Sequence, residues 1–384
     1  MINLMILEKK LHLLWKFNIL LLVMQSNLSV AQNDNCWASY RGNQELSGHT
    51  NASLPDDLKL LWTFKTGDVI KSSPVSCNDN IYIGSNNGGV FCISKTGKQI
   101  WKFSTETSIE APPLILDNTV YVGSLEGLLF ALNAKTGKQK WKYKTNGQIS
   151  GSANWVSSAN SKSKRIIIGS YDYYLHCVDA QTGKAIWKYE TDNFINGAPA
   201  TDGKVTVFGG CDGYLHLVDV QKGTRLDTIN IGTYIASSAA LEDNKAYFGN
   251  YDGIFFCTDL KTRRIIWQYE STKSFLGSPA ISGNMVIIGS YDRNVYCFDK
   301  ITGIMQWKFR TMQKIDGSPV IAHNKVVIAS GDGRVYMLDF NTGNKIWSYE
   351  IGSPIIGTPL VIKNMIVVGA QDGIVYAFGL KSNK

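Results

Sequence analysis

The chain has 384 residues and a formal net charge of +8, with 44% hydrophobic and 18% charged residues. This composition excludes a disordered chain, and the basic residues form no run typical of nucleic-acid binding, so we expect no nucleic-acid partner. The longest apolar run near the start is far short of a membrane span, which excludes a polytopic membrane protein.

Residues 1–31 have the pattern of a secretory signal peptide, in which three lysines precede a short apolar core at residues 17–24. Small residues lead up to Ala31, where we expect cleavage. The apolar core is too short for a single-pass anchor. No lipidation box is found, because Cys36, the first cysteine, follows the polar residues 33–35. The sequence predicts a protein exported to the periplasm or the outside of the cell.

Beyond this segment we expect a lead-in at residues 32–57, a repeat region at residues 58–380 and a tail at residues 381–384. The repeat is marked by tryptophans spaced about 40 residues apart, with one gap of 80 that hides a degenerate copy carrying Asp227 in place of Trp. The seven tryptophans are Trp62, Trp101, Trp141, Trp187, Trp267, Trp307 and Trp347.

Each of the eight copies contains four short apolar runs separated by turn residues, among them recurrent Asp-Gly pairs typical of β-hairpins. Four antiparallel strands per copy and no helical periodicity predict an all-β fold, an eight-bladed β-propeller. A Greek-key sandwich array would have longer, less uniform units. The last copy has only three strands, so we expect residues 58–64 to complete it and close the ring.

The tryptophans are expected to act as wedges between blades, each docking on a turn that carries Gly. The fourth copy has lost its Trp, and the fifth has Arg263 where Gly is expected. We therefore expect these two blades to be less regular than the others.

The seven cysteines do not resemble a disulfide framework. Cys92, Cys177, Cys257 and Cys297 occupy one repeat position that carries Ala, Leu or Met in the other copies. Such a position is a buried apolar one, so we expect mostly reduced, packed thiols.

The segments 131–141 (ALNAKTGKQKW) and 178–187 (VDAQTGKAIW) closely resemble the tryptophan-docking motif of the PQQ-type (pyrroloquinoline quinone) propeller repeat. The resemblance extends over residues 58–380. Two groups share this repeat. One comprises quinoprotein dehydrogenases, and the other comprises BamB-type proteins, which are non-catalytic scaffolds of outer-membrane β-barrel assembly.

The quinoprotein enzymes use an adjacent Cys-Cys pair and a Ca²⁺ site, and this chain has no adjacent cysteines. Its recurrent aspartates occupy one equivalent turn in six separate blades, which indicates a turn role. His176 and His216 occupy a position that is otherwise aromatic, so we expect packed side chains. We therefore expect no catalytic residue, no metal and no cofactor. The alternative is a dehydrogenase of alcohols or sugars that uses pyrroloquinoline quinone with Ca²⁺.

One variable position lies in the innermost strand of every blade, after a recurrent Ile. We expect its side chains to line the mouth of the central channel as a binding site or as ordinary solvated groups. The polar members are Lys71, Glu110, Ser150, Asn196 and Asp316.

Aromatic residues gather in the loops of blades three to six and are missing from the other blades at the same positions. We expect them on the face of the channel mouth as an aromatic crescent that holds a protein, peptide or glycan, the alternative being scattered surface aromatics. The crescent comprises Tyr171, Phe194, Tyr234, Tyr251, Phe275 and Tyr291. The sequence thus favours a non-catalytic binding or scaffolding propeller.

Overall fold

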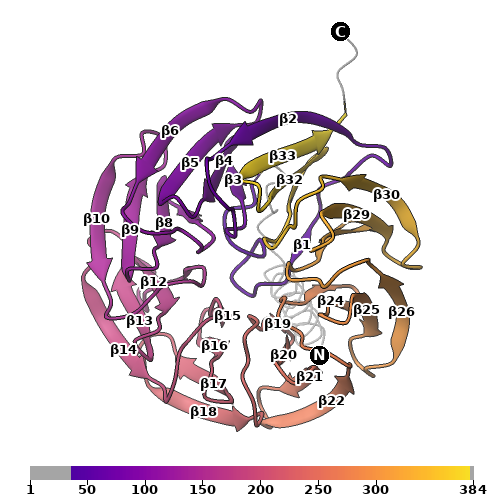
Figure 1. Ribbon diagram of the computed structural model, residues 1–384. Coiled ribbons are helices and arrows are strands. Elements are labelled where there is room, and N and C mark those ends of the chain that lie inside the picture. Colours follow the sequence, from indigo (N-terminus) through magenta and orange to yellow (C-terminus); the bar gives the residue numbers. More distant parts are fainter. Residues whose placement is uncertain (1–35, 381–384) are drawn as a thin grey trace, which may run out of the picture. The chain divides into compact units, whose positions relative to one another are not determined.

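A computed structural model describes residues 36–380, which form eight sheets arranged as the blades of a ring (Figure 1). The signal-peptide prediction and the tail at residues 381–384 lie outside the described residues. Within residues 36–380 no helix has the length and apolar character needed to cross a membrane. The predicted eight-bladed β-propeller is confirmed.

Blades 1 to 4 each contain four antiparallel strands in chain order from the innermost to the outermost. Blade 1 has β3 (Val75–Cys77), β4 (Asn80–Gly84), β5 (Gly89–Ser94) and β6 (Gln99–Ser104), and blade 2 has β7 (Leu114–Leu116), β8 (Thr119–Gly123), β9 (Leu128–Asn133) and β10 (Gln139–Lys144). Blade 3 has β11 (Asn154–Ser157), β12 (Lys164–Gly169), β13 (Tyr174–Asp179) and β14 (Ala185–Glu190), and blade 4 has β15 (Ala200–Thr201), β16 (Val205–Gly209), β17 (Tyr214–Asp219) and β18 (Arg225–Asn230).

Blades 5 to 8 repeat this order, except that blade 7 has a fifth strand, β1, and blade 8 has the N-terminal strand β2 as its outermost strand. Blade 5 has β19 (Ala240–Glu242), β20 (Lys245–Gly249), β21 (Ile254–Asp259) and β22 (Arg264–Glu270), and blade 6 has β23 (Ala280–Ser282), β24 (Met285–Gly289), β25 (Asn294–Asp299) and β26 (Met305–Arg310). Blade 7 has β27 (Val320–Ala322), β28 (Lys325–Ala329), β29 (Arg334–Asp339) and β30 (Lys345–Glu350), with β1 (His49–Thr50) parallel to β27. Blade 8 has β31 (Leu360–Ile362), β32 (Met365–Gly369), β33 (Ile374–Gly379) and β2 (Lys59–Lys65).

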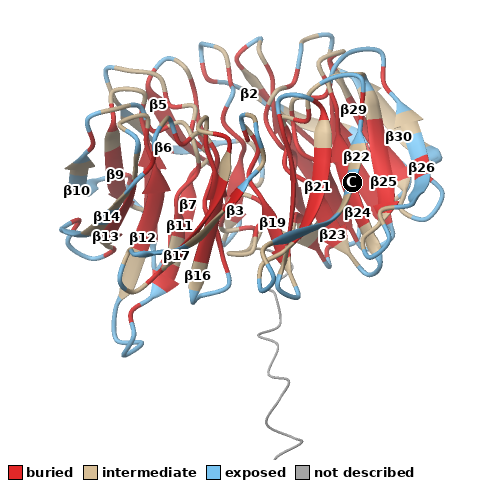
Figure 2. Ribbon diagram, turned by 90° about the horizontal axis from the view of Figure 1, so that it is seen from below, coloured by how far each residue is buried: buried red, intermediate tan, exposed pale blue. Residues whose placement is uncertain are grey.

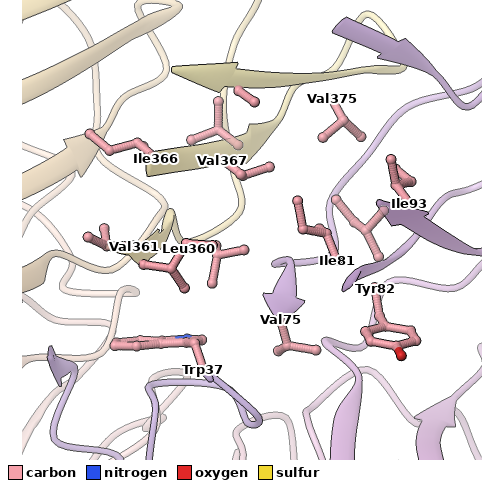
Figure 3. Close-up of a cluster of buried hydrophobic side chains, with 14 of the residues drawn as sticks. Trp37, Val75, Ile81, Tyr82, Ile93, Leu360, Val361, Ile366, Val367 and Val375 are labelled. Atoms are coloured by element: carbon pink, nitrogen blue, oxygen red, sulfur yellow. The ribbon is translucent and has the colours of Figure 1, made fainter. Parts of the chain in front are cut away.

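The strand β2 completes blade 8, as the sequence predicts. It pairs antiparallel with β33, and Trp62 lies opposite Ala377. This pairing covers the edge that β33 would otherwise expose. Beside it, Val75 of blade 1 and Leu360 of blade 8 contribute to one buried cluster that also contains Trp37 (Figure 3).

The burial of each strand follows its place in the blade. Strand β8, in the middle of blade 2, is buried along its whole length, whereas the outermost strand β22 exposes most of its residues. Figure 2 shows the same contrast between β25 and the outermost strand β26 of blade 6. Middle strands lie between two neighbouring blades, so both of their faces are covered and they consist of near-continuous apolar runs. Outer strands have a covered face and a solvated face, which produces the alternation seen in the sequence.

Every tryptophan of the repeat joins its blade to the next blade. Trp101 donates its indole N–H to the carbonyl oxygen of Ala134 at 2.9 Å. Gly137 follows in the same turn with φ 70°, and a Cβ added there would come within 2.7 Å of the Trp101 ring. Glycine is thus required twice, for its positive φ and for the close approach of the indole.

The lead-in segment forms a structure that the sequence did not reveal. Residues 37–53, here called the lead-in belt, run around the centre of the ring and contact the innermost strand of each blade in turn, or in blade 8 the turn that follows it. Its hydrogen-bond partners in blades 1 to 8 are Ser76, Ile115, Trp155, Thr201, Leu241, Ile281, Ile321 and Asn364. The belt therefore ties all eight blades together by a second means besides the β2–β33 pairing.

Arg41 anchors the middle of this belt. Its side chain is fully buried, and its guanidinium donates to the carbonyl oxygens of Pro279 at 2.6 Å and Pro319 at 2.5 Å. Burial lowers the pKa of Arg41 to about 10, although the coulombic interaction with Tyr40 opposes this. These hydrogen bonds compensate for the removal of a cation from water and join the belt to blades 6 and 7.

The expectation of mostly reduced, packed thiols is confirmed, with one exception. Cys36 and Cys77 form a disulfide that attaches the start of the belt to β3. Among the described residues the other five, which include the four at the repeat position, are free thiols. Blades 4 and 5 both have four strands, so the expected irregularity is wrong for the strands and is confined to side chains at the seam between the two blades.

Candidate functional site

The upper face, defined here as the face that carries the hairpins between the second and third strands of the blades, brings two sets of loops together. The backbone N–H of Tyr251, in such a hairpin, donates to the carbonyl oxygen of Tyr234, in the loop that leads into the innermost strand. The Cys211 N–H makes the same bond to Phe194, at 2.9 Å in both cases. The repeat thus holds hairpin and inner-loop side chains next to each other.

The predicted channel-mouth residues do converge. Lys71, Glu110, Ser150, Asn196 and Asp316 all line one cavity of about 250 Å³ in the centre of the ring, together with the apolar residues at the same repeat position. This convergence follows from the repeat. The position is equivalent in all eight blades, so its side chains all face the central axis of the ring.

The charges at the channel mouth form two clusters. In the first, the Lys71 ammonium lies 2.7 Å from the Glu110 carboxylate. In the second, Asp316 accepts hydrogen bonds from the Tyr291 hydroxyl and from Lys314, the latter at 3.1 Å. Burial, and then the Asp316 carboxylate, raise the pKa of Tyr291 to about 12. Each carboxylate therefore already has a cationic partner.

The opposite end of the cavity is occupied by the lead-in belt. Tyr40 lines the cavity, and its hydroxyl lies 3.3 Å from Ser278 Oγ and 3.1 Å from Ser318 Oγ. The belt contacts the innermost strands of all the blades on this side. A ligand of the channel therefore has its approach from the upper face.

Exposed aromatic rings on the upper face gather over blades 3 to 5. Tyr171 stacks on Phe194 with ring centroids 4.8 Å apart, and Tyr173 lies 5.3 Å from the same ring. Tyr234 and Tyr251 form a second pair at 6.4 Å, and they are 51% and 55% exposed. We call these five residues the upper-face aromatic group.

Two members of the predicted crescent do not belong to this exposed group. Phe275 is fully buried, because it occupies the position that Ile235 and Ile315 hold in the neighbouring blades. The residue equivalent to Tyr234 is Ser274, so the sequence comparison was displaced by one residue here. Tyr291 is half-buried, as Tyr171 is, but it stacks on no ring of the group, and its hydroxyl donates to Asp316 in the cluster of the channel mouth.

Tyr173 was missed by sequence reasoning. It has φ 72° at a hairpin position that carries glycine in every other blade except blade 6, where Arg293 has φ 76°, and its side chain is 43% exposed. A bulky residue with positive φ is a conformational outlier, and such strain concentrates at functional sites. The replacement of Gly by Tyr in the hairpin was the available signal.

The recurrent hairpin aspartates are engaged by side chains of their own blades. Asp172 accepts a hydrogen bond from His176 Nε2 at 3.0 Å, and Asp212 is bonded to His216 Nε2 at 2.8 Å. In other blades a tyrosine at the same place takes this role, as Tyr336 does with Asp332 at 2.7 Å. The two histidines therefore occupy packed aromatic positions.

The described side chains do not fit a quinone–calcium centre. Within residues 36–380 no three acidic, histidine or cysteine side chains converge in a way that would hold a metal ion, whereas Ca²⁺ takes six to eight oxygens. A polyanionic quinone also needs cations that are not already paired, and Lys71 and Lys314 both contact carboxylates.

Comparisons with known proteins give two family matches. Residues 149–384 match the family described as beta-alanine-activating enzyme, beta-propeller, and residues 52–169 match the one described as outer membrane protein assembly factor BamB. No curated protein matches the chain at a significant level.

Several solved structures are similar in fold. BamB from Moraxella catarrhalis has 22% identity and a TM-score of 0.71, covering 85% of this chain and 99% of that one. Quinohemoprotein alcohol dehydrogenase from Comamonas testosteroni has 14% identity and a TM-score of 0.77, covering 92% and 82%. A europium-containing methanol dehydrogenase has 12% identity and a TM-score of 0.79, covering 92% and 99%. At these identities the likeness concerns the fold alone.

Proposed function

The chain belongs to the family described as beta-alanine-activating enzyme, beta-propeller, and residues 52–169 match the family described as outer membrane protein assembly factor BamB. On this basis we propose that it is an exported, non-catalytic module that binds a protein partner. The partner binds through a peptide segment at the upper face. The upper-face aromatic group supplies the apolar contacts, and the channel mouth supplies polar ones.

The single observation that carries this proposal is the uneven distribution of exposed aromatic rings. They gather over three of eight equivalent blades, although repeat symmetry by itself would distribute them evenly. Exposed Tyr and Phe side chains are unfavourable in water and are the residue types that anchor protein interfaces. Stacking of Tyr171 on Phe194 holds these rings in place before a partner arrives, which lowers the entropy cost of binding.

The proposal is tested with a displayed library of random peptides, selected against the purified protein. Selected peptides are then titrated by calorimetry against a variant that combines Phe194→Ala, Tyr234→Ala and Tyr251→Ala. The matched control combines Ile301→Ala, Ile304→Ala and Met305→Ala, which removes exposed apolar side chains from the edge of blade 6. We expect the first variant to lose at least tenfold in affinity and the control to bind as the unmodified protein does.

Three outcomes would contradict the proposal. The first is a library that enriches no peptide, and the second is a peptide that binds the aromatic variant undiminished. The third is reduction of a dye by alcohols or sugars once pyrroloquinoline quinone and Ca²⁺ are added, which would favour the dehydrogenase. A glycan array probed in parallel would reveal selective binding of an oligosaccharide, which would replace the protein partner.

A further inference from the structure

The seam between blades 4 and 5 differs from every other junction of the ring. At the seven remaining junctions, a Trp N–H donates to a turn carbonyl of the neighbouring segment at 2.9–3.1 Å. At the seam Asp227 stands in place of Trp, and Arg263 stands in place of the glycine that receives the indole. One ion pair thus replaces one buried ring.

This ion pair fills less of the seam than an indole does. Arg263 Nε lies 2.9 Å from Asp227 Oδ2, and the two side chains are 33% and 45% exposed. Arg263 also has φ 62°, a conformation that the glycines of the other turns adopt without strain. The two replacements compensate each other in charge, and at this seam Val205 and Leu260 are only partly buried against the core cluster that contains Val207 and Leu217.

A cavity of about 860 Å³ lies at this seam. Its apolar wall comprises Val207 and Leu217 of blade 4 and Leu241 and Leu260 of blade 5. Leu217 is the direct register partner of Asp227, so the wall lies under the position of the missing ring. Sites for small ligands commonly measure about 300–1,000 Å³, so the cavity has the size of a binding site.

The seam also has an acceptor without a donor. In blades 1, 2 and 5 the carbonyl that accepts the Trp N–H also accepts a tyrosine hydroxyl, as Ala134 does from Tyr82 at 3.2 Å. In blade 4 the position of that tyrosine is Val207. Among residues 36–380 no hydrogen bond reaches the equivalent carbonyl, which belongs to Leu260. Leu260 is half-buried, so this carbonyl oxygen is open to a ligand able to supply a donor.

The rim of the cavity carries both signs of charge. Glu45 of the lead-in belt and Glu242 lie on it, and so do Lys245 and Lys261. The cavity continues past the seam to Ser282 of blade 6. A single aromatic ring would fill only part of this cavity. The remaining space can hold the residues that precede and follow the aromatic residue in a peptide.

We propose that this cavity is a second binding site, which takes a tryptophan side chain of a partner peptide in place of the ring that the repeat lacks. The indole packs on Val205 and Leu260, above the buried Val207 and Leu217. Its N–H donates to the Leu260 carbonyl, and Arg263 lies against its face. The site is formed by the belt and the turns opposite to the hairpins, so it is separate from the upper-face aromatic group. It stands independently of the function proposed above.

The experiment titrates the full chain with a blocked five-residue peptide, Gly-Gly-Trp-Gly-Gly, and with the same peptide carrying Ala in place of Trp. Free L-tryptophan is a third probe. We expect saturable binding of the Trp peptide by calorimetry, at least tenfold weaker binding of free L-tryptophan, and no binding of the Ala peptide.

Two variants fill the site from within the chain. Asp227→Trp combined with Arg263→Gly restores the repeat, and Val207→Tyr supplies the hydroxyl that Tyr82 provides in blade 1. The second variant keeps the test decisive should the first fail to fold. Leu226→Ala, an exposed neighbour on the outer strand, is the matched control. We expect each filled variant to lose at least tenfold in affinity, and the control to be unchanged.

Equal binding of the Ala peptide, undiminished binding by the folded filled variants, or no binding of the Trp peptide to the unmodified protein would each overturn the proposal. Binding of free L-tryptophan as tight as that of the peptide would overturn the peptide assignment.

Discussion

Loss of the disulfide between Cys36 and Cys77 should loosen the lead-in belt and lower the stability of the whole ring. The bond joins residues 41 positions apart and fixes the start of the belt to β3. By the loop-entropy relation, a crosslink over a loop of this length stabilises the folded state by about 4 kcal/mol. For the roughly 345 residues described, the entropy of unfolding converts this into a decrease of about 5–6 °C in the melting temperature.

The assay is thermal unfolding of a Cys36→Ser, Cys77→Ser double variant, followed by circular dichroism with and without reductant. We expect the double variant to melt about 5–6 °C lower and to be insensitive to reductant, while the unmodified protein with reductant behaves like the variant. Cys211→Ser removes a free thiol and serves as the control. A double variant that melts within 1 °C of the unmodified protein would refute the reasoning that the belt restrains the ring.

Two further predictions concern the wedges and the hairpin aspartates. Trp307→Ala removes an indole that is only 8% exposed, so we expect the free energy of unfolding, measured by chemical denaturation, to fall by about 3–5 kcal/mol. The control Ile304→Ala changes an exposed side chain and should lower it by less than about 0.5 kcal/mol. Equal effects of the two substitutions would contradict the wedge role. For Asp172, burial raises the pKa, but hydrogen bonds from His176 and the Asn146 N–H outweigh it and lower the pKa to about 2. Since the pKa is depressed on folding, the stability that this carboxylate contributes is present above about pH 4 and is lost as the pH falls toward 2. The difference in unfolding free energy between the unmodified protein and Asp172→Asn should therefore disappear between about pH 4 and pH 2. A difference that persists at pH 2 would contradict the role of the hydrogen bonds. Asp252→Asn, at an exposed aspartate, is the control.

The fold could be predicted because each blade is stabilised by contacts between neighbours in the chain. Every hairpin has its own turn residues, seven copies have the wedge Trp, and six of these rings dock on a glycine of the next copy, so the pattern recurs around the ring. Even the closure of blade 8 was predictable, since three strands at one end and one at the other leave a single complementary pairing. The convergence of Lys71, Glu110 and Asp316 at the channel mouth followed from the same symmetry.

The candidate sites were predicted less well, because they lie where the repeat is broken. Phe275 was placed one residue out of register, and only its burial in an isoleucine position revealed the error. Tyr173 was overlooked because a tyrosine in a glycine position looks like an ordinary substitution until its φ is known. Asp227 and Arg263 were both recognised as losses, but their pairing across the seam could not be inferred from residues 36 positions apart.

The amino-acid sequence alone determined the number of blades, their strand order and the way the ring closes, because these depend on short-range patterns of apolar and turn residues. The path of the lead-in belt, the Cys36–Cys77 bond and the cavity at the seam were decided only by the tertiary structure. The belt binds largely through backbone groups, which every residue possesses, to blades spaced about 40 residues apart, so its sequence carries no period from which those contacts could be predicted.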